Sequence, residues 1–188
     1  MIDLSHWDYD YPPRRLVEMT EKHKFFYLKA SEGISEVDNT ATLWYNDIKK
    51  ASEGRAQIGF YHVLSPDNGE AQFLHFTQTL LHLPQAQLVS CIDIENEVWS
   101  EPGATEALQR MVSLHGNPRR LLLYCSESDR QEIQRLHPYC PLWIADYGLR
   151  PTGLGGDPQV AAWQWTSAGE FGCDESLVFR PALLEVLR

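Results

Sequence analysis

Residues 88–99 read LVSCIDIENEVW and contain the pattern that decides the predicted fold. The stretch begins with apolar residues typical of a β-strand and then places an acid at every second position, at Asp93, Glu95 and Glu97. Because side chains alternate along a strand, Asp93 and Glu95 share one face with the apolar Cys91. A strand that is apolar along its length and acidic at its end fits a closed barrel in which the apolar part fills the interior. The acids then emerge where the barrel opens to a substrate.

The length and composition predict one ordinary globular domain over residues 1–188. Hydrophobic residues make up 43% of the 188 positions and charged residues 22%. The chain carries 16 Lys and Arg against 26 Asp and Glu, a formal net charge of -10. This balance argues against nucleic acid and against an anionic membrane surface as partners. We expect a monomer.

The chain shows no pattern of a membrane span, a targeting segment or a metal site. No apolar run reaches the length of a transmembrane helix, and the start MIDLSHWDYDYPPRR lacks the layout of a signal peptide. We therefore expect either cytosolic synthesis with later release or a domain trimmed from a secreted precursor. The four cysteines are widely spaced without a CxxC pair, which favours buried thiols over disulfides or zinc ligands. No metal and no cofactor are predicted.

Short β-rich runs alternate with helical patterns along the whole chain. The eight predicted strands are Ile2–Ser5, Phe25–Ala30, Gln57–Val63, Leu88–Glu95, Leu121–Cys125, Leu142–Asp146, Val160–Thr166 and Phe171–Asp174. This alternation predicts an α/β fold, an irregular TIM-like (β/α) barrel with eight parallel strands and fewer than eight helices. Residues 147–159 and 167–170 are too short or too rich in Gly and Pro for regular helices, so helices should be missing around the last three strands. An open doubly wound sheet is the alternative.

Six segments between or after these strands carry helical patterns. The clearest is Thr105–His115, whose apolar residues share one face and which Gly116 and Pro118 should end. The others follow Pro12-Pro13, follow Asp38-Asn39 as far as Ala51, start at Pro66-Asp67-Asn68, start at a capping box of Ser128 and Gln131, and span Pro181–Leu187.

Polar and aromatic side chains collect at the ends of the predicted strands, where the chemistry of a parallel barrel is found. The acids at these ends that we expect to be catalytic are Asp3, Asp93, Glu95 and Asp174. The side chains that we expect to bind substrate are Glu32, Tyr61, Tyr124, Trp143, Asp146, Tyr147, Trp163 and Gln164. Carboxyl groups surrounded by aromatic rings suit glycoside hydrolysis, which needs one protonated carboxyl and another group that stabilises a cationic transition state.

The spacing of Asp93 and Glu95 adds a constraint on that chemistry. Two residues apart on one strand, their Cα atoms should lie about 6.6–6.8 Å apart, and their proximity should raise the pKa of one carboxyl. The spacing does not distinguish retention from inversion at the sugar, because side-chain rotamers span both separation classes.

Seven segments in the same order resemble the lysozyme-type muramidases of glycoside hydrolase family 25, which include phage endolysins. They are MIDLSHW (1–7), FFYLKASEG (25–33), IGFYHVLSP (58–66), CIDIEN (91–96), PLWIADYG (141–148), AAWQWTSAG (161–169) and CDESLVF (173–179). The resemblance covers almost the whole chain. It implies an irregular barrel that cleaves the β-1,4 bond between N-acetylmuramic acid and N-acetylglucosamine in the peptidoglycan of the cell wall, an antibacterial activity.

The resemblance also implies roles for the four acids. Glu95 would be the general acid, and Asp93 would stabilise the acetamido group of the substrate or a charged intermediate. Asp3 and Asp174 would complete the site, and the reaction would proceed with retention. The last segment departs from the family pattern, with Cys173 in place of Val and with Glu-Ser in place of an Asn-containing pair, so Asp174 has the weakest support.

Three alternatives stay open at this point. One is an acetamido-sugar hydrolase that acts on chitin-like polymers, and another is a barrel that binds glycan without cleaving it. The third is a metal-dependent barrel enzyme that uses Asp93, Glu95 and Asp174 as oxygen ligands.

Overall fold

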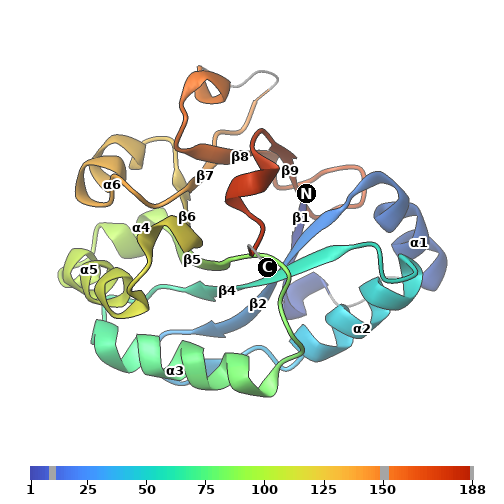
Figure 1. Cartoon of the computed structure of the whole chain (residues 1–188), viewed down its shortest axis with the longest axis horizontal. Coiled ribbons are helices and arrows are strands. Elements are labelled where there is room, and N and C mark those ends of the chain that lie inside the picture. Colours follow the sequence, from blue (N-terminus) through green and yellow to red (C-terminus); the bar gives the residue numbers. More distant parts are fainter. Residues whose placement is uncertain (9–11, 149–152, 187–188) are drawn as a thin grey trace.

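The computed structural model describes residues 1–8, 12–148 and 153–186. Its strands form one sheet that closes on itself, in the order β1-β9-β8-β7-β6-β5-β4-β2, with β1 pairing β2 (Figure 1). The strands are β1 (Ile2–Leu4), β2 (Phe25–Glu32), β3 (Glu36–Val37), β4 (Gln57–Val63), β5 (Ser90–Ile94), β6 (Leu121–Ser126), β7 (Leu142–Ala145), β8 (Val160–Thr166) and β9 (Asp174–Val178). The two-residue β3 pairs with the end of β2 and lies outside the closed barrel. The predicted eight-stranded irregular barrel is therefore confirmed.

Six α-helices lie outside the barrel, fewer than its eight strands, as the sequence predicted. They are α1 (Pro13–Lys22), α2 (Ala41–Ala51), α3 (Gly69–His82), α4 (Asn96–Trp99), α5 (Ala104–His115) and α6 (Arg130–Leu136). Four 3-10 turns are also present, namely η1 (His6–Asp8), η2 (Pro118–Arg120), η3 (Leu154–Gly156) and η4 (Pro181–Leu183). In the described part of the chain no α-helix follows β7 or β8, which matches the Gly- and Pro-rich composition there.

The last strand corrects the expectation of an all-parallel barrel. β9 runs antiparallel to both of its neighbours, β1 and β8. The connection from β8 to β9, residues 167–173, is too short for a parallel crossover, which needs a dozen or more residues. β9 also begins at Asp174, where the predicted strand Phe171–Asp174 was expected to end.

Two predicted helix features were wrong, and one helix was missed. The first turn of α6 has Asp129 at its N-cap with no side-chain cap, because the Ser128 hydroxyl bonds Ser126 instead. The predicted helix Pro181–Leu187 is only the turn η4 within the described residues, since the chain then pairs with residues 87–89. The short α4, directly after β5, was not predicted.

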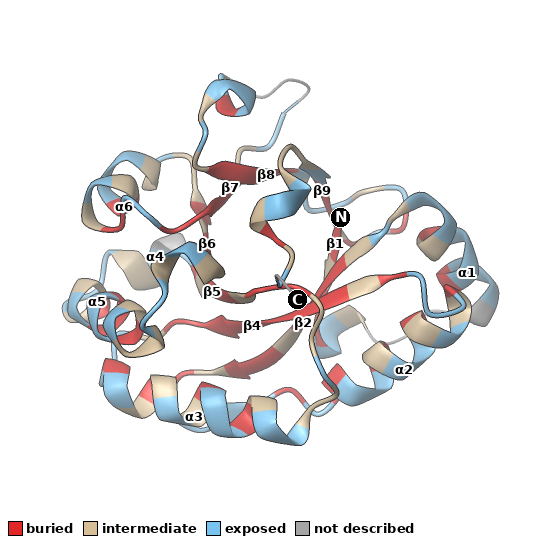
Figure 2. Cartoon of the chain, in the orientation of Figure 1, coloured by how far each residue is buried: buried red, intermediate tan, exposed pale blue. Residues whose placement is uncertain are grey.

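The apolar core has two layers, one inside the barrel and one between the strands and the helices. Large interior side chains include Tyr27, Tyr61 and Trp143, and the outer layer includes Trp44 of α2 and Met111 of α5. Figure 2 shows buried strands surrounded by helices whose outward faces are exposed. All four cysteines are buried and free of disulfides, as predicted.

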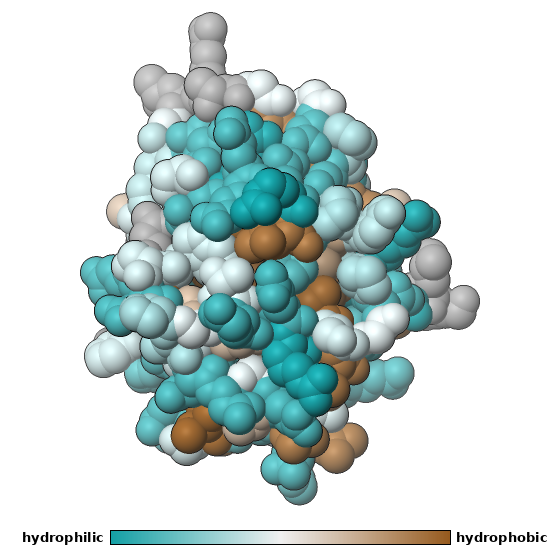
Figure 3. Space-filling view, turned by 90° about the vertical axis from the view of Figure 1, so that its left-hand side faces the viewer, coloured by the Kyte–Doolittle hydropathy of each residue, from teal (hydrophilic) through white to brown (hydrophobic). Residues whose placement is uncertain are grey.

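The two ends of the barrel differ. At the end where the parallel strands begin, η4 lies across the opening in the middle of Figure 1, and Leu184 packs into the interior with its carbonyl accepting from the Val89 amide at 2.7 Å. The opposite end is open, and the carboxyl ends of the parallel strands surround it. The molecular face on the α5 and α6 side is mostly hydrophilic with small hydrophobic patches (Figure 3). Within the described residues, no helix is long and apolar enough to cross a membrane.

Candidate active site

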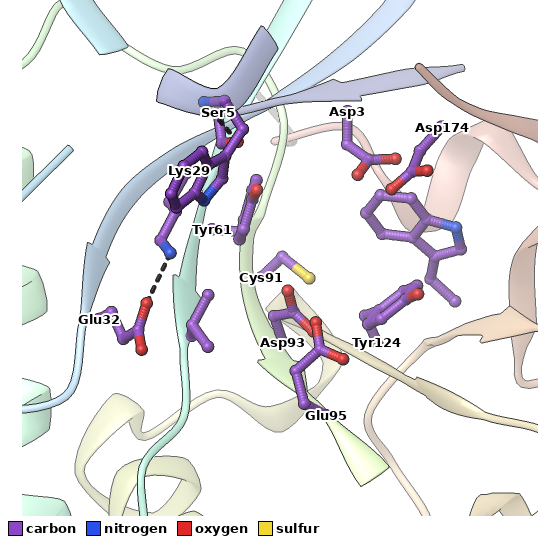
Figure 4. Close-up of a pocket in the computed structure, with 13 residues that line it drawn as sticks. Asp3, Ser5, Lys29, Glu32, Tyr61, Cys91, Asp93, Glu95, Tyr124 and Asp174 are labelled. Carbon is purple, nitrogen blue, oxygen red and sulfur yellow. Dashed lines mark hydrogen bonds and ion pairs between the residues drawn. The ribbon is translucent and has the colours of Figure 1, made fainter. Parts of the chain in front are cut away.

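A cavity of about 340 Å³ fills the open end of the barrel (Figure 4). Four carboxyl groups, from Asp3, Asp93, Glu95 and Asp174, line it, and we call this set the acidic cup. The sequence therefore predicted four acids that the fold brings into one cavity.

The first pair of the acidic cup comes from β5 and the residue that follows it. Asp93 lies beside Val63 of β4 and Tyr124 of β6 in the sheet, and its side chain enters the cavity together with that of Cys91. Glu95 follows the end of β5 and is exposed at the mouth. The alternation along the strand thus carries both acids to the interior face, as expected.

The electrostatics of this first pair favour bound protons. Burial raises the pKa of Asp93 well above its ordinary value, and the negative charge of Glu95 adds to the rise. Burial also raises the pKa of Glu95, and Asp174 is the next largest cause. The ammonium of Lys29 opposes both shifts. One oxygen of Asp93, Oδ1, is buried and has no hydrogen-bond partner among the described residues.

The second pair of the acidic cup is built across the seam that closes the barrel. Asp3 of β1 and Asp174 of β9 are directly opposite each other in the antiparallel register, and their carboxyl groups face each other in the cavity (Figure 4). Burial raises the pKa of both, and in Asp3 the neighbouring Asp174 raises it further. Two carboxyl groups this close share a proton more readily than both ionise.

A bulge in β2 directs one ion pair into the cavity. The register between β2 and β4 shifts between Lys29 and Ser31, so Ala30 is an extra residue. As a result Lys29 and Glu32 both line the cavity although they are three residues apart, and Lys29 Nζ lies 2.6 Å from Glu32 Oε2. Ser31 points away from the cavity, where its hydroxyl is 2.9 Å from His62 Nδ1.

Three aromatic side chains expected to contact substrate form one wall and the floor of the cavity. Tyr61, Tyr124 and Trp143 all line it, and the rings of Tyr124 and Trp143 meet edge to face with centroids 4.9 Å apart. The indole of Trp143 donates to Ser176 Oγ at 2.9 Å, so this ring is held inside the barrel. Tyr124 donates its hydroxyl to Gln164.

A second, shallower cavity of about 730 Å³ continues from the first. The two cavities share Glu32, Val63, Glu95 and Tyr124 as lining residues. The expected contacts Asp146 and Tyr147 line this second cavity rather than the first, and Tyr147 is 60% exposed. Glu95 therefore lies where the two cavities meet.

Two of the expected substrate contacts line neither cavity. Trp163 packs in the outer core beneath the helices, with its indole donating to the Asp146 carbonyl at 2.7 Å. Gln164 points into the barrel but is only 1% exposed, behind Tyr124. Neighbours on a strand face opposite sides, so Trp163 and Gln164 could not both face the cavity.

Sequence reasoning missed Trp7 at the rim of the first cavity. Its side chain is 84% exposed and lines the cavity from η1, the turn after β1. Two carboxylates anchor this turn. The buried carboxylate of Asp38 accepts a hydrogen bond from the His6 backbone N–H at 2.8 Å and also faces the His6 ring. The carboxylate of Asp8 accepts a hydrogen bond from the Ser5 backbone N–H at 2.9 Å. A pattern search along strands could not find Trp7, since it lies beyond the strand end.

The site holds acids and aromatic faces but little positive charge. Of the described residues that line the first cavity, Lys29 is the one Lys or Arg, and it is paired. Among the described residues, no group of three or more His, Cys, Asp or Glu side chains is arranged to hold a metal ion. Paired carboxyls with raised pKa values can supply a proton and also stabilise a developing cation.

A closed barrel with such an acidic cup and aromatic walls suits a glycoside hydrolase. The model of the family described as Glycosyl hydrolases family 25 matches residues 2–173, and the chain belongs to this family. The match ends one residue before Asp174, so for Asp174 the geometry of the acidic cup is the stronger argument.

Known proteins with similar sequences or folds agree with this assignment. The chain is 24% identical over 155 residues to an autolytic lysozyme of Clostridium acetobutylicum, covering 76% of this chain and 43% of that protein's length. The structure of a muramidase from Trichobolus zukalii is similar with a TM-score of 0.71 at 20% identity, covering 94% of this chain and 91% of that one. A family 25 glycosyl hydrolase from Bacillus anthracis gives a TM-score of 0.65 at 24% identity, with coverages of 93% and 83%.

Proposed function

We propose that this protein is a lysozyme-type peptidoglycan hydrolase that cleaves the β-1,4 bond between N-acetylmuramic acid and N-acetylglucosamine. The observation that carries the proposal is the position of Glu95. It lies at the junction of two continuous cavities, directly beside the deeper Asp93. A glycan strand that fills both cavities has one glycosidic bond at this junction.

Glu95 acts as the general acid in this proposal. Asp93 and Glu95 interact closely, and the raised pKa values of both carboxyls favour a proton held by the pair. Glycan covering the exposed Glu95 removes water from its carboxyl and raises its pKa further, which keeps the proton there. Glu95 then protonates the departing glycosidic oxygen as the bond to the anomeric carbon breaks.

Asp93 acts on the sugar that remains in the deep cavity. Its carboxylate accepts a hydrogen bond from the acetamido N–H while the acetamido oxygen bonds to the anomeric carbon and takes up the positive charge. Water then attacks the anomeric carbon from the face that the leaving group vacated, and Glu95 accepts a proton from that water. The bond from the anomeric carbon to the acetamido oxygen breaks in this step, which restores the neutral acetamido group. The outcome is retention, with the proton on Glu95 restored.

The proposal also covers the place of action, the assembly and the substrate contacts of the protein. The protein acts on the cell wall, as a monomer and as a single catalytic domain over residues 1–188, without cofactor or metal. The aromatic faces of Tyr61, Tyr124 and Trp143 contact the C–H surfaces of the sugars in the deep cavity, and Tyr147 contacts the strand beyond Glu95.

Product analysis tests the proposed reaction. Purified peptidoglycan and chitin are digested in parallel, new reducing ends are converted to alditols with borohydride, and mass spectrometry identifies them. We expect N-acetylmuramitol ends from peptidoglycan, and no such release with the Glu95→Gln variant. Release of N-acetylglucosaminitol from chitin at comparable rates would favour the chitin-type alternative. Glycan binding without turnover in enzyme excess would favour a binding barrel, and loss of turnover on chelation that a divalent ion restores would favour a metal enzyme.

A further inference from the structure

Gln164 is a buried amide placed between two groups of the cavity wall. Its side chain is 1% exposed, and its Oε1 accepts the hydroxyl proton of Tyr124. On its other side lies Asp174, a diagonal neighbour on β9 within reach of the long amide side chain. Gln164 has no access to substrate, but it lies beside one acid of the acidic cup. It can therefore affect the reaction only through that acid.

The sheet register explains why Gln164 reaches Asp174. Gln164 of β8 pairs with Ser176 of β9, and Asp174 lies two residues further along β9 on the same face. Diagonal neighbours of this kind lie within reach of long side chains. The register shift between Gln164 and Thr166 makes Trp165 the extra residue of the strand beside this contact.

The donors and acceptors of the amide then fix the ionisation of Asp174. An amide oxygen only accepts, and an amide nitrogen only donates. Since the Tyr124 hydroxyl donates to Oε1, the nitrogen is left to face Asp174, where it stabilises the carboxylate form. Asp174 in turn accepts a hydrogen bond from the protonated carboxyl of Asp3, which lies directly opposite across the β1–β9 seam.

We propose that Gln164 is a positioning residue that keeps Asp174 ionised and leaves the proton of the seam pair on Asp3. The directions of the pKa shifts of Asp174 and Asp3 agree with this assignment. Burial raises the pKa of Asp174, while the hydrogen bonds from Asp3 and Gln164 hold it down. The pKa of Asp3 is raised well above its ordinary value by burial and then by Asp174.

The other groups around Asp174 come from four further elements and one loop. They are Asp3 of β1, Asp8 of η1, Asp93 and Glu95 at the end of β5, Tyr124 of β6 and Tyr147 after β7. The carboxylates among these raise the pKa of Asp174 when ionised, and Asp8 is the largest of them. Asp174 therefore needs a neutral donor to stay ionised, and Gln164 supplies one.

The consequence for catalysis rests on the proposed function. A fixed negative charge at Asp174 stabilises the cationic transition state from the side of the cavity opposite Asp93. A proton held on Asp3 keeps the total charge of the acidic cup low enough for the four acids to coexist. Gln164 thus controls the lower pH limit of activity without touching the substrate.

Two variants of Gln164 test the assignment with two readouts. Gln164→Leu and Gln164→Met both remove the donor, and Met also keeps the length of the side chain. The first readout is the titration of Asp174 by carbon-13 NMR of labelled aspartate, assigned with Asp174→Asn, which needs no activity. The second is the acidic limb of the pH profile of kcat/KM on peptidoglycan.

In both variants we expect the pKa of Asp174 to rise by about one unit and the acidic limb of the profile to move to higher pH by the same amount. Gln72→Leu is the matched control, because Gln72 is also fully buried but supports the loop after β4. It should lower the thermal midpoint and leave both titrations at their wild-type positions.

An unchanged or lowered pKa of Asp174 in folded Gln164→Leu would overturn the inference. A lowered value would mean that the amide accepts from a protonated Asp174. If Gln164→Leu does not fold, Gln164→Met decides by the same titration. A protein that cleaves no glycan but shows the NMR shift would refute the proposed function and leave the role of Gln164 intact.

Discussion

The acidic cup contains two pairs of acids that are assembled in different ways. Asp93 and Glu95 belong to one strand and its immediate end, and alternation alone directs both inward. Asp3 and Asp174 come from strands at opposite ends of the chain and meet only because β9 closes the barrel antiparallel to β1. Lys29 opposes the raised pKa values of the β5 pair, whereas the seam pair depends on neutral hydrogen-bond donors.

This difference in construction suggests a division of labour. Glu95 is exposed at the junction of the two cavities, where a proton can be exchanged with substrate and water. The seam pair lies within the cavity and is more suited to providing a fixed field. The β5 pair should therefore dominate the chemistry, and variants of the two pairs should differ in size and in kind.

The largest effect is expected for Glu95→Gln. Removing the proposed general acid should lower kcat about 1000-fold, since positioned proton transfer contributes about 10²–10⁴-fold. Glycan affinity should stay near the wild-type value, because the shape of the cavity is kept. Release of reducing ends gives kcat, and calorimetry with glycan fragments gives the affinity. Glu101→Gln, an exposed site after α4, is the control. Wild-type turnover in Glu95→Gln would remove the distinction between the pairs.

Asp93→Asn should reduce kcat about 100-fold, in the range found when one electrostatic stabiliser of a transition state is lost. Combined with Glu95→Gln, the loss should be far smaller than the product of the two single losses, because the acids act as one unit. Single-turnover rates of the two single variants and the double variant measure this coupling. Fully multiplicative losses would show that the two acids act independently.

Trp7→Ala should weaken substrate binding without changing the chemical step. Stacking of an exposed ring contributes about 0.5–1.5 kcal/mol, so KM should rise about 3–10-fold while kcat stays constant. Tyr139→Ala is the matched control, since Tyr139 is 64% exposed and lies beside Arg119, away from both cavities. Equal KM values for wild type and Trp7→Ala would place the glycan elsewhere on the rim.

Lys29→Met should shift the alkaline limb of the pH profile. The ammonium lowers the pKa of both Asp93 and Glu95, so its loss should raise both and extend activity to higher pH by less than about one unit. Lys24→Met, an exposed lysine at the closed end of the barrel, should leave the limb in place. A shift toward lower pH would contradict the electrostatic role of Lys29.

The smallest effect concerns stability. The pKa of Asp93 is raised on folding, so the native state binds the proton more tightly than the unfolded chain, and stability falls as pH rises from the unfolded pKa through the folded one. An Asn side chain at this position does not ionise, so it loses no stability as pH rises. Asp93→Asn should therefore raise the thermal midpoint at pH 8 by about 2–4 °C, the shift that about 1 kcal/mol produces in a domain of this size. The gain should vanish near pH 4, and a gain independent of pH would point to packing instead.

The sequence predicted the parts of the molecule that depend on local patterns. The strands β4 and β8 have the predicted bounds, and the alternation in Leu88–Glu95 correctly placed Asp93 and Glu95 on the interior face. The residue types that end the strands also identified eight of the thirteen residues that line the first cavity.

The parts that sequence reasoning missed depend on relations between strands. The antiparallel direction of β9 follows from a short connection whose ends could not be located, because its strand was expected three residues too early. The extra residue Ala30 in β2 is visible only against the register of β4. Trp163 was expected at the cavity for a related reason, since strand-end position alone does not say which side of the barrel a ring faces. Trp7 was missed because it lies beyond the end of β1.

The β1–β9 seam also ties catalytic competence to the completion of folding. Ile2 and Asp3 pair with Glu175 and Asp174, so this contact joins the two ends of the chain and carries the entropic cost of closing a long loop. Until it forms, half of the acids are apart and β1 and β8 keep open edges. A partly synthesised or partly unfolded chain therefore carries an incomplete site, and hydrolytic power arises together with the closed barrel.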